Sequence, residues 1–506
     1  MKKQASDKTA YMCFQEYVAE KPEGIFLFDE EKSLSGAQAF SAVKGLANRF
    51  YGMGIREGTY VALRSARSVN TAVIFLALQI IGAVAVMADP HVAVRQYISE
   101  SGVGMNPGFY ITNEEASMDP SYGEGWTVID ETAGTSTPLA VGEIASEDVC
   151  FPPLADSKKA SIIVFTSGST GKSKAVMLSQ YAFINNVHLS CDRAGITKDD
   201  SMILILPLHH VFAVSVVFNT LYTHSALFIP EKAGLDDLMD GISRYGITLI
   251  VGVPTLFLAM AAKNAQKPIP TLRIGYIGGA PCSIEQFRRI ETGLNMKMCT
   301  VYGMSEFVSI TFVDHRLPME VRAIGVGAPS DLNEVAVRDD DGNLLRQGET
   351  GEIGVRGPSR MNGYFGEEPS DPSEYFFTGD LGFLDEQGIL HICGRKKDII
   401  IRNGTNISTA KIENAITELQ DVSSAAVVGI PHAKLGEIPC AMVVMQKSGE
   451  DISEEQLLHS LSKTLAKNEL PYLICMTDSI PLTSTGKADK QKIKEYFAAR
   501  LKEKGE

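Results

Sequence analysis

Several common features are missing from this sequence of 506 residues, and each absence narrows the class of protein. None of the eight cysteines forms a Cys-x-x-Cys pair, and their scattered positions favour buried thiols in a reducing cytosol over disulfides or a metal cluster. No arginine-rich run occurs, and 61 acidic residues against 47 basic ones give a formal charge of −14. This charge balance disfavours a protein that binds the phosphate backbone of a nucleic acid.

No signal peptide is expected either, because no continuous apolar stretch follows the lysines at the start of the chain. One uncharged segment, residues 71–88, approaches the length of a membrane span. Gly82 divides it into a leucine-rich half and a half rich in alanine and valine, and Asp89-Pro90 closes it as a turn. This pattern favours a helix and a strand buried in an α/β sheet, and therefore a cytoplasmic protein without a membrane span.

Short apolar strands alternate with helical stretches through much of the chain, which is the rhythm of a mainly parallel sheet. A helix is expected at residues 180–194. From Glu334 to about Gly394 the pattern changes to alternating strands with acidic turns, which predicts a smaller β-rich layer. The expected apolar strands are residues 61–63, 109–111, 128–129, 162–165, 202–206, 227–229, 249–253 and 273–279.

A domain boundary is expected at residues 394–398, where the sequence reads Gly-Arg-Lys-Lys-Asp. The fold class is therefore predicted as α/β, with a large domain over residues 1–396 of parallel-rich sheets layered with helices plus the β-rich layer. A small α+β domain is predicted over residues 397–506, which is long enough to fold independently. Its expected elements are strands at 399–401, 425–428 and 441–444 and helices at 410–419 and from about 489. The lysines of that last helix are interpreted as a solvated face.

The chain is organised around residues 166–174, which read Thr-Ser-Gly-Ser-Thr-Gly-Lys-Ser-Lys and follow an apolar strand. Glycine allows a tight turn whose N–H groups can point at an anion, and hydroxyls and lysines complete a cradle for phosphate. A P-loop NTPase is the nearest alternative, because residues 171–173 match the end of G-x-x-x-x-G-K-[ST]. Thr166 stands where that pattern requires glycine, so the P-loop interpretation fails by one residue.

The same stretch resembles the phosphate-binding loop of the adenylate-forming superfamily, which includes acyl-CoA synthetases, peptide-synthetase adenylation domains and firefly luciferase. The family pattern [YF]-T-S-G-[ST]-T-G-x-P-K-G matches Phe165 to Ala175, with Ser173 in place of the proline and Ala175 in place of the last glycine. Further blocks follow in the family's order. They are Gly-Gly-Ala-Pro at 278–281, Tyr-Gly-Met-Ser-Glu at 302–306, Thr-Gly-Asp at 378–380, Gly-Arg at 394–395 and Pro-Leu-Thr-Ser-Thr-Gly-Lys at 481–487.

The resemblance implies the roles of single residues in binding Mg·ATP. Tyr302 would stack on adenine, Ser305 would contact the α-phosphate, and Glu306 would hold Mg²⁺ as an oxygen ligand. The implied nucleotide-binding residues are Thr166, Ser167, Gly168, Ser169, Thr170, Gly171, Lys174, Gly279, Ala280, Pro281, Tyr302, Gly303, Ser305, Asp380, Arg395 and Lys487. The implied catalytic residues are Thr166, His210, Glu306 and Lys487.

Asp380 and Arg395 flank a strand pair whose turn is expected at residues 385–388. A hairpin of this length would bring its two ends side by side, so both charges could face one ligand. The resemblance implies that the ligand is the ribose of ATP. The alternative interpretation is a simple salt bridge at the surface base of the hairpin.

The acyl site is expected near His210, which aligns with the histidine beside this site in carboxylate-activating members of the family. Amino-acid-activating members carry an aspartate in the region that follows, where it pairs with the substrate ammonium. No acidic residue occurs between Pro207 and Pro230, so the expected substrate is a non-amino carboxylic acid.

The expected function is that of an AMP-forming acid–thiol ligase that uses ATP, Mg²⁺ and CoA. By resemblance, the small domain rotates about Lys397 and brings Lys487 to the carboxylate and α-phosphate while the acyl-adenylate forms. Two alternatives remain open. One is an enzyme that loads the acid onto a carrier protein, and the other is a non-catalytic nucleotide- or acyl-binding module, to which the departures at Ser173, Ala175 and Thr409 point.

Overall fold

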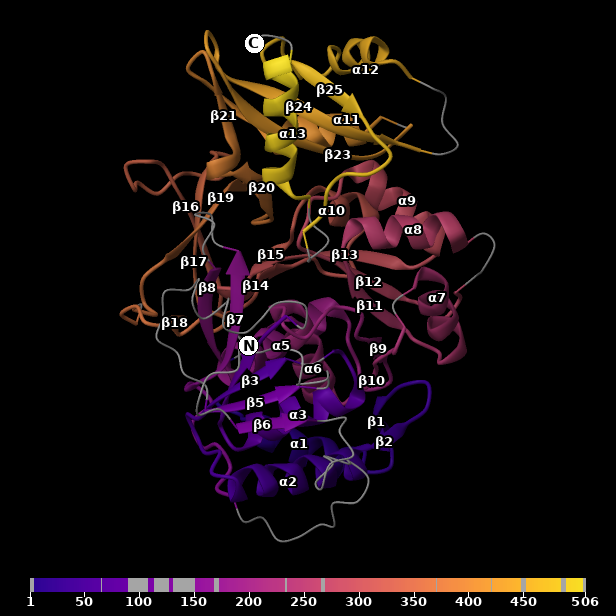
Figure 1. Cartoon of the computed structure of the whole chain (residues 1–506), viewed down its shortest axis with the longest axis vertical. Helices are drawn as coiled ribbons and strands as arrows, with labels where there is room; N and C mark the ends of the chain where they lie inside the picture. The colour runs from indigo at the N-terminus through magenta and orange to yellow at the C-terminus, as the bar shows by residue number, and fades with distance from the viewer. Residues whose placement is uncertain are drawn as a thin grey trace.

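The computed structural model gives the arrangement of the helices and strands and places the C-terminal elements, orange to yellow, at one end of the long axis (Figure 1). The indigo N-terminal elements lie toward the other end (Figure 1). The structure describes residues 4–64, 66–89, 108–112, 127–130, 151–167, 173–232, 234–264, 269–369, 371–419, 421–446, 452–483 and 488–503.

A nine-stranded sheet forms the middle of the molecule. Its strand order is β15 (Ala328–Pro329), β14 (Phe307–Phe312), β13 (Lys297–Met304), β12 (Ile274–Ile277), β11 (Leu249–Gly252), β9 (Ser201–Ile203), β10 (Ala226–Phe228), β1 (Ile25–Phe28) and β2 (Ser33–Ser35). The strands from β13 to β1 are parallel. Leu249 and Val251 of β11 enter one hydrophobic core while Ile250 between them enters another, so the sheet is buried on both faces. Continuous apolar strands are the sequence signature of such a sheet.

Helices cover the two faces of this sheet. The core on one side includes residues of α1 (Ala10–Glu20), α2 (Gly36–Gly52), α3 (Val69–Ile80), α5 (Gln180–Ala194) and α6 (Val211–Thr223). The core on the other side includes residues of α7 (Leu235–Arg244), α8 (Pro254–Asn264) and α9 (Ile284–Leu294). The short helix α10 (Met319–Ile324) contacts α9 and β13. The helix predicted at 180–194 is confirmed with both ends.

A seven-stranded sheet carries the residues around the predicted phosphate loop. Its order is β18 (Gly363–Tyr364), β8 (Ser173–Ser179), β7 (Ala160–Ser167), β4 (Val84–Met87), β3 (Tyr60–Arg64), β5 (Phe109–Thr112) and β6 (Thr127–Asp130). The uncharged segment 71–88 supplies buried residues of α3 and all of β4, and Gly82 between them has φ +73°. The predicted helix and strand are therefore confirmed. No helix among the described residues is long and apolar enough to cross a membrane.

The predicted β-rich layer is a four-stranded antiparallel sheet. Its strands are β16 (Glu334–Arg338), β17 (Gly351–Arg356), β19 (Phe376–Leu384) and β20 (Leu390–Arg395), in that order. The 3₁₀ turn η2 (Lys396–Asp398) follows β20 directly. The layer therefore ends where the sequence predicts its end.

The last part of the chain builds its own sheet and two cores. The sheet contains β21 (Ile399–Arg402), β22 (Thr405–Ser408), β23 (Val422–His432), β24 (Gly436–Met445) and β25 (Leu473–Met476). Helices α11 (Thr409–Thr417), α12 (Glu454–Leu461) and α13 (Lys490–Glu503) accompany it (Figure 1). The α/β fold class with a C-terminal α+β part is thus confirmed, whereas the boundary between residues 396 and 397 stays a prediction.

Two details differ from the sequence expectation. The strand predicted at 202–206 ends at Ile203, because the Ile205 carbonyl accepts a hydrogen bond from the Arg67 guanidinium, 2.5 Å away, instead of continuing the sheet. The interpretation of the C-terminal lysines as a solvated face is wrong for Lys490. Its ammonium lies 2.9 Å from an oxygen of Asp398 and 3.7 Å from an oxygen of Glu413.

Candidate active site

The predicted site residues gather where the strands of the nine-stranded sheet end. His209 and His210 follow β9, and the turn at 278–281 follows β12. The block at 302–306 forms the end of β13 and the turn that leads to β14. Because β9, β11, β12 and β13 are parallel, their carboxyl ends meet at one edge. Ligands of open α/β sheets bind outside this edge.

The two strands that flank the predicted phosphate loop pair with each other as a hairpin. Strands β7 and β8 are antiparallel, and the pairs Thr166–Lys174 and Ser167–Ser173 close its described part. A P-loop instead joins a strand to a helix, so the hairpin agrees with the rejection of that alternative. Gly168, Ser169, Thr170 and Gly171 lie outside the described residues.

The two departures from the family's loop pattern fall within strand β8. Ala175 is buried and packs with Val84, Val86 and Ile163 of the neighbouring strands. A methyl group therefore fills a core position at this point of the hairpin. Neither Ser173 nor Ala175 interrupts the strand.

The turn at 278–281 is closely packed at Gly278, which is buried. A Cβ atom on Gly278 would lie 3.1 Å from the Phe212 ring and 3.2 Å from the Val301 carbonyl oxygen. Gly279 has φ +78°, a conformation that favours glycine. The turn therefore lies between the start of α6 and the end of β13, with Ala280 half-buried and Pro281 exposed.

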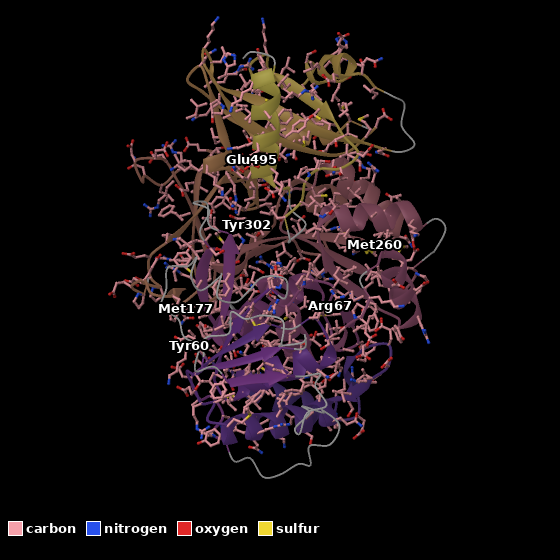
Figure 2. The ribbon with its side chains drawn as sticks, in the orientation of Figure 1. Tyr60, Arg67, Met177, Met260, Tyr302 and Glu495 are labelled. Atoms are coloured by element: carbon pink, nitrogen blue, oxygen red, sulfur yellow. The ribbon has the colours of Figure 1, made fainter. Side chains whose placement is uncertain are left out.

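Tyr302, Asp380 and Arg395 form one hydrogen-bonded cluster. The Tyr302 hydroxyl donates to Asp380 Oδ2 over 2.7 Å, and Arg395 Nε lies 3.0 Å from Asp380 Oδ1. Asp380 and Arg395 are direct partners across β19 and β20, so the predicted hairpin is confirmed. Burial and the neighbouring Asp380 carboxylate raise the pKa of Tyr302, which keeps its hydroxyl a donor. Figure 2 places Tyr302 between Glu495 of α13 and Met177 of β8 along the long axis.

Gly303 explains how closely β13 and β14 approach at this cluster. A Cβ atom on Gly303 would clash with the Val308 carbonyl oxygen and would lie only 2.9 Å from Ser309 Cα. Only glycine fits without moving the backbone of β14. The glycine of the Tyr-Gly-Met-Ser-Glu block therefore has a packing reason, and Ser305 and Glu306 occupy the turn that follows, both half-buried.

Glu306 lies in a second cluster with Tyr364, which the sequence analysis missed. The Tyr364 hydroxyl donates to Glu306 Oε1 over 2.9 Å, and Lys174 Nζ lies 4.1 Å from the centre of the Tyr364 ring. Lys174 Nζ is also 3.7 Å from an oxygen of Glu367. Burial, followed by the charge of Glu306, raises the pKa of Tyr364. In the sequence, the dipeptide Gly363-Tyr364 does not indicate that the tyrosine contacts Glu306, so this contact was not predicted.

His210 is the N-cap residue of α6, but its side chain does not accept the capping hydrogen bond from the first turn of the helix. Its ring centre lies 4.2 Å from that of His209, and His209 Nε2 lies 3.7 Å from Asp89 Oδ2. Asp89 is buried and follows β4 of the other sheet. The contact therefore joins the two sheets beside the predicted acyl site, and no motif of the sequence indicated it.

Lys487 lies outside the described residues, but the base of its loop is described. Leu482 and Ala488 form an isolated β-bridge, and Asp489 N donates to the Pro481 carbonyl over 2.8 Å. The predicted hinge residue Lys397 is exposed in η2. Among the described residues, no group of three or more His, Cys, Asp or Glu side chains could hold a metal ion.

Comparisons with known proteins agree with this arrangement. The profile of the AMP-binding enzyme family matches residues 14–365, and the profile of the AMP-binding enzyme C-terminal domain matches residues 411–487. The 2-succinylbenzoate–CoA ligase of Lactococcus lactis is 29% identical over 437 residues, which cover 86% of this chain and 90% of the relative. The 3-methylmercaptopropionyl-CoA ligase of Ruegeria lacuscaerulensis is 32% identical over 372 residues, 69% of this chain and 68% of the relative.

A solved structure extends the similarity over the whole chain. ATP-bound MatB from Rhodopseudomonas palustris superposes with a TM-score of 0.84 and 26% sequence identity, and the match covers 97% of this chain and 99% of MatB. The profile matches, the named CoA ligases and this fold lead to one conclusion. The chain belongs to the AMP-binding enzyme family and is an AMP-forming ligase of the acyl-CoA synthetase type.

Proposed function

We propose that this chain activates a non-amino carboxylic acid with Mg·ATP at the edge of the nine-stranded sheet and then transfers the acyl group to CoA. In the first step the carboxylate attacks the α-phosphate, forms acyl-adenylate and releases pyrophosphate. In the second step a thiol attacks the acyl carbon, forms the thioester and releases AMP. The observation that carries the proposal is the meeting of the Tyr302–Asp380–Arg395 cluster and the Glu306–Tyr364–Lys174 cluster at one edge.

Asp380, Arg395 and Tyr302 would hold the nucleoside of ATP. The buried Asp380 carboxylate is a charged acceptor, and hydrogen bonds to charged groups are the strong ones. It would accept from the ribose hydroxyls, while Arg395 donates to the same ligand. The turn at 278–281 would lie along the adenine, because Gly279 is exposed and carries no side chain.

Glu306 and the phosphate hairpin would hold the triphosphate and Mg²⁺. A half-buried carboxylate fits this metal, which takes few protein oxygens alongside phosphate oxygens. When bound, Mg²⁺ would screen the negative charge of the phosphates. Thr166 and Lys174 face each other across the hairpin, so their side-chain groups would meet the phosphates together with Ser305.

The acyl group would lie along α6, next to His210. Most of α6 is buried and apolar, and its first turn carries no acidic residue. An α-amino acid would bring an ammonium group to this site, and an unpaired buried charge costs several kcal/mol. We therefore assign a non-amino acid as substrate, without a preference for chain length or for an aromatic ring.

Lys487 would reach the α-phosphate and the carboxylate from the small domain, residues 397–506. Rotation of this domain about Lys397 would then exchange Lys487 for a surface that admits the thiol. Rotation about a few residues is a common form of domain motion. The protein would carry out both steps in the cytoplasm.

Release of pyrophosphate tests the proposal. The protein is incubated with Mg·ATP and a panel of carboxylic acids, with and without CoA. The products are identified by mass spectrometry. Pyrophosphate and an acyl-CoA are the expected products. Pyrophosphate without acyl-CoA would favour the carrier-protein alternative, and ATP binding without pyrophosphate would favour the non-catalytic module.

A further inference from the structure

Residues 359–365, here called the bridging segment, hydrogen-bond to both sides of the candidate ATP site. On one side they meet the turn that carries Glu306. Val308 N donates to the Ser359 carbonyl over 3.1 Å, and Met361 N donates to the Glu306 carbonyl over 2.9 Å. The backbone of Glu306 is therefore fixed by this segment.

On its other side the bridging segment pairs with β8, the second strand of the phosphate hairpin. Asn362 N donates to the Met177 carbonyl over 2.8 Å, and Phe365 N donates to the Ala175 carbonyl over 2.9 Å. Tyr364 is the direct partner of Val176 in this pairing. The segment thus joins two parts of the site that are more than a hundred residues apart in sequence.

Tyr364 extends from this segment toward both parts. Its hydroxyl donates to Glu306 Oε1 over 2.9 Å. The Lys174 ammonium lies over the Tyr364 ring, 4.1 Å from the ring centre. A carboxylate that accepts one hydrogen bond from a fixed donor loses freedom of rotation. Partners of this kind orient metal-binding carboxylates.

We propose that Tyr364 is a positioning residue for the ligase reaction, whose hydroxyl holds the Glu306 carboxylate in the orientation that binds Mg²⁺. The proposal rests on the proposed function, in which Glu306 is the metal ligand. Tyr364 touches neither substrate nor metal in this role. Its hydroxyl acts through Glu306 alone.

The variant Tyr364→Phe tests this role because it keeps the ring and removes only the hydroxyl. ATP binding is measured by calorimetry over a range of Mg²⁺ concentrations and again in EDTA. The Mg²⁺ concentration that gives half of the metal-dependent gain in ATP affinity should rise about 10- to 100-fold, the usual effect of removing such a partner. Affinity for metal-free ATP should stay unchanged, and a thermal melt reports whether the variant is folded.

A mutant cycle with Glu306→Gln separates positioning from a merely structural role. Tyr364→Phe should have no further effect on the Mg²⁺ dependence when Glu306 is already replaced, since its effect passes through that carboxylate. Equal effects in both backgrounds, or a Mg²⁺ dependence like that of the wild type in Tyr364→Phe, would overturn the proposal. No effect of Glu306→Gln would instead overturn the metal assignment, and the positioning role with it.

Tyr375→Phe is the matched control. The Tyr375 hydroxyl donates to Glu334 Oε2 over 3.2 Å, and the Arg356 guanidinium lies 4.8 Å from the centre of its ring. The substitution therefore removes the same kind of contact, outside the site. Its Mg²⁺ dependence should equal that of the wild type.

Discussion

At the scale of the residue, burial decides what a charged side chain does. Asp380 exposes only 6% of its surface, whereas the Arg395 side chain is about half exposed. The interpretation of this pair as a surface salt bridge is therefore wrong for the aspartate. A buried carboxylate with Tyr302 and Arg395 as partners contributes to folding and is also ready to accept hydrogen bonds from a ligand.

Asp380→Asn should weaken ATP binding and lower the melting temperature together. The amide keeps the volume of the side chain but loses the charge, and charged hydrogen bonds are worth roughly 1.5–3 kcal/mol each. We expect the dissociation constant of ATP to rise about ten- to a hundredfold. Calorimetric titration and a thermal melt of the same sample measure the two effects.

Glu334→Gln provides the control for Asp380→Asn. Glu334 pairs with Arg356 at the opposite edge of the same four-stranded sheet, and its side chain is 54% exposed. An exposed pair contributes about 0–1 kcal/mol to the free energy of unfolding. ATP binding should be unchanged. An Asp380→Asn protein that melts earlier but binds ATP normally would show that the cluster serves folding alone.

At the scale of the element, α6 determines the expected choice of substrate. Its apolar first turn lies beside His210, and the buried Asp89 lies 3.7 Å from His209. We predict turnover of non-amino carboxylic acids and negligible turnover of α-amino acids, measured as pyrophosphate release. The Asp89→Asn variant completes the test. Efficient turnover of an amino acid that disappears in this variant would identify Asp89 as an ammonium partner and contradict the prediction.

Lys490 joins the start of helix α13 to Asp398 of η2 and to Glu413 of α11. Burial raises the pKa of Glu413, and the Lys490 ammonium opposes this rise. A carboxyl group with a raised pKa in the folded state contributes stability at acid pH, and this contribution is lost as the pH rises through the raised value. Lys490→Met removes the opposing charge and should raise that pKa further.

Lys490→Met should therefore lower the melting temperature more at about pH 8 than at about pH 5. Leaving buried acceptors without their donor should cost about 1–3 kcal/mol of the free energy of unfolding at the higher pH. Lys492→Met is the control, because Lys492 is exposed and pairs only across one helical turn with Asp489 at 3.5 Å. An equal fall in melting temperature at both pH values would show that the titration of Glu413 does not contribute to the effect.

At the scale of the whole molecule, the C-terminal sheet contacts a helix that covers the nine-stranded sheet. The side chain of Gln286 on α9 donates to the Ser423 carbonyl over 3.1 Å, which joins the two parts. Leu482 and Ala488, on either side of residues 484–487, pair as an isolated β-bridge. Rotation of the predicted small domain would carry Lys487 with it.

Lys487→Ala should therefore affect one half-reaction much more than the other. Formation of the adenylate should fall by about 10²–10³, the usual cost of losing one donor to the charge of the transition state. Formation of thioester from preformed acyl-adenylate should remain largely intact. Single-turnover measurements of each step distinguish them, and an equal fall in both would contradict the assigned role.

The sequence alone determined the features that depend on local order along the chain. The hydroxyl and glycine stretch at 166–174, the apolar strands and the hairpin that joins Asp380 to Arg395 depend on residue type and spacing over short distances. Backbone geometry converts such spacing directly into strands and turns. For this reason the fold class was predictable from residue type and spacing, whereas the family was identified by the resemblance of the motifs to those of known enzymes.

Tertiary structure decided which distant side chains meet. The contacts of Tyr364 with Glu306, of Asp89 with His209 and of Lys490 with Glu413 join residues from different blocks of the sequence. Such contacts depend on the order of strands in a sheet and on how sheets pack, which no local pattern encodes. The burial of Asp380 has the same origin, because Tyr302 of β13, in another sheet, lies against its carboxylate.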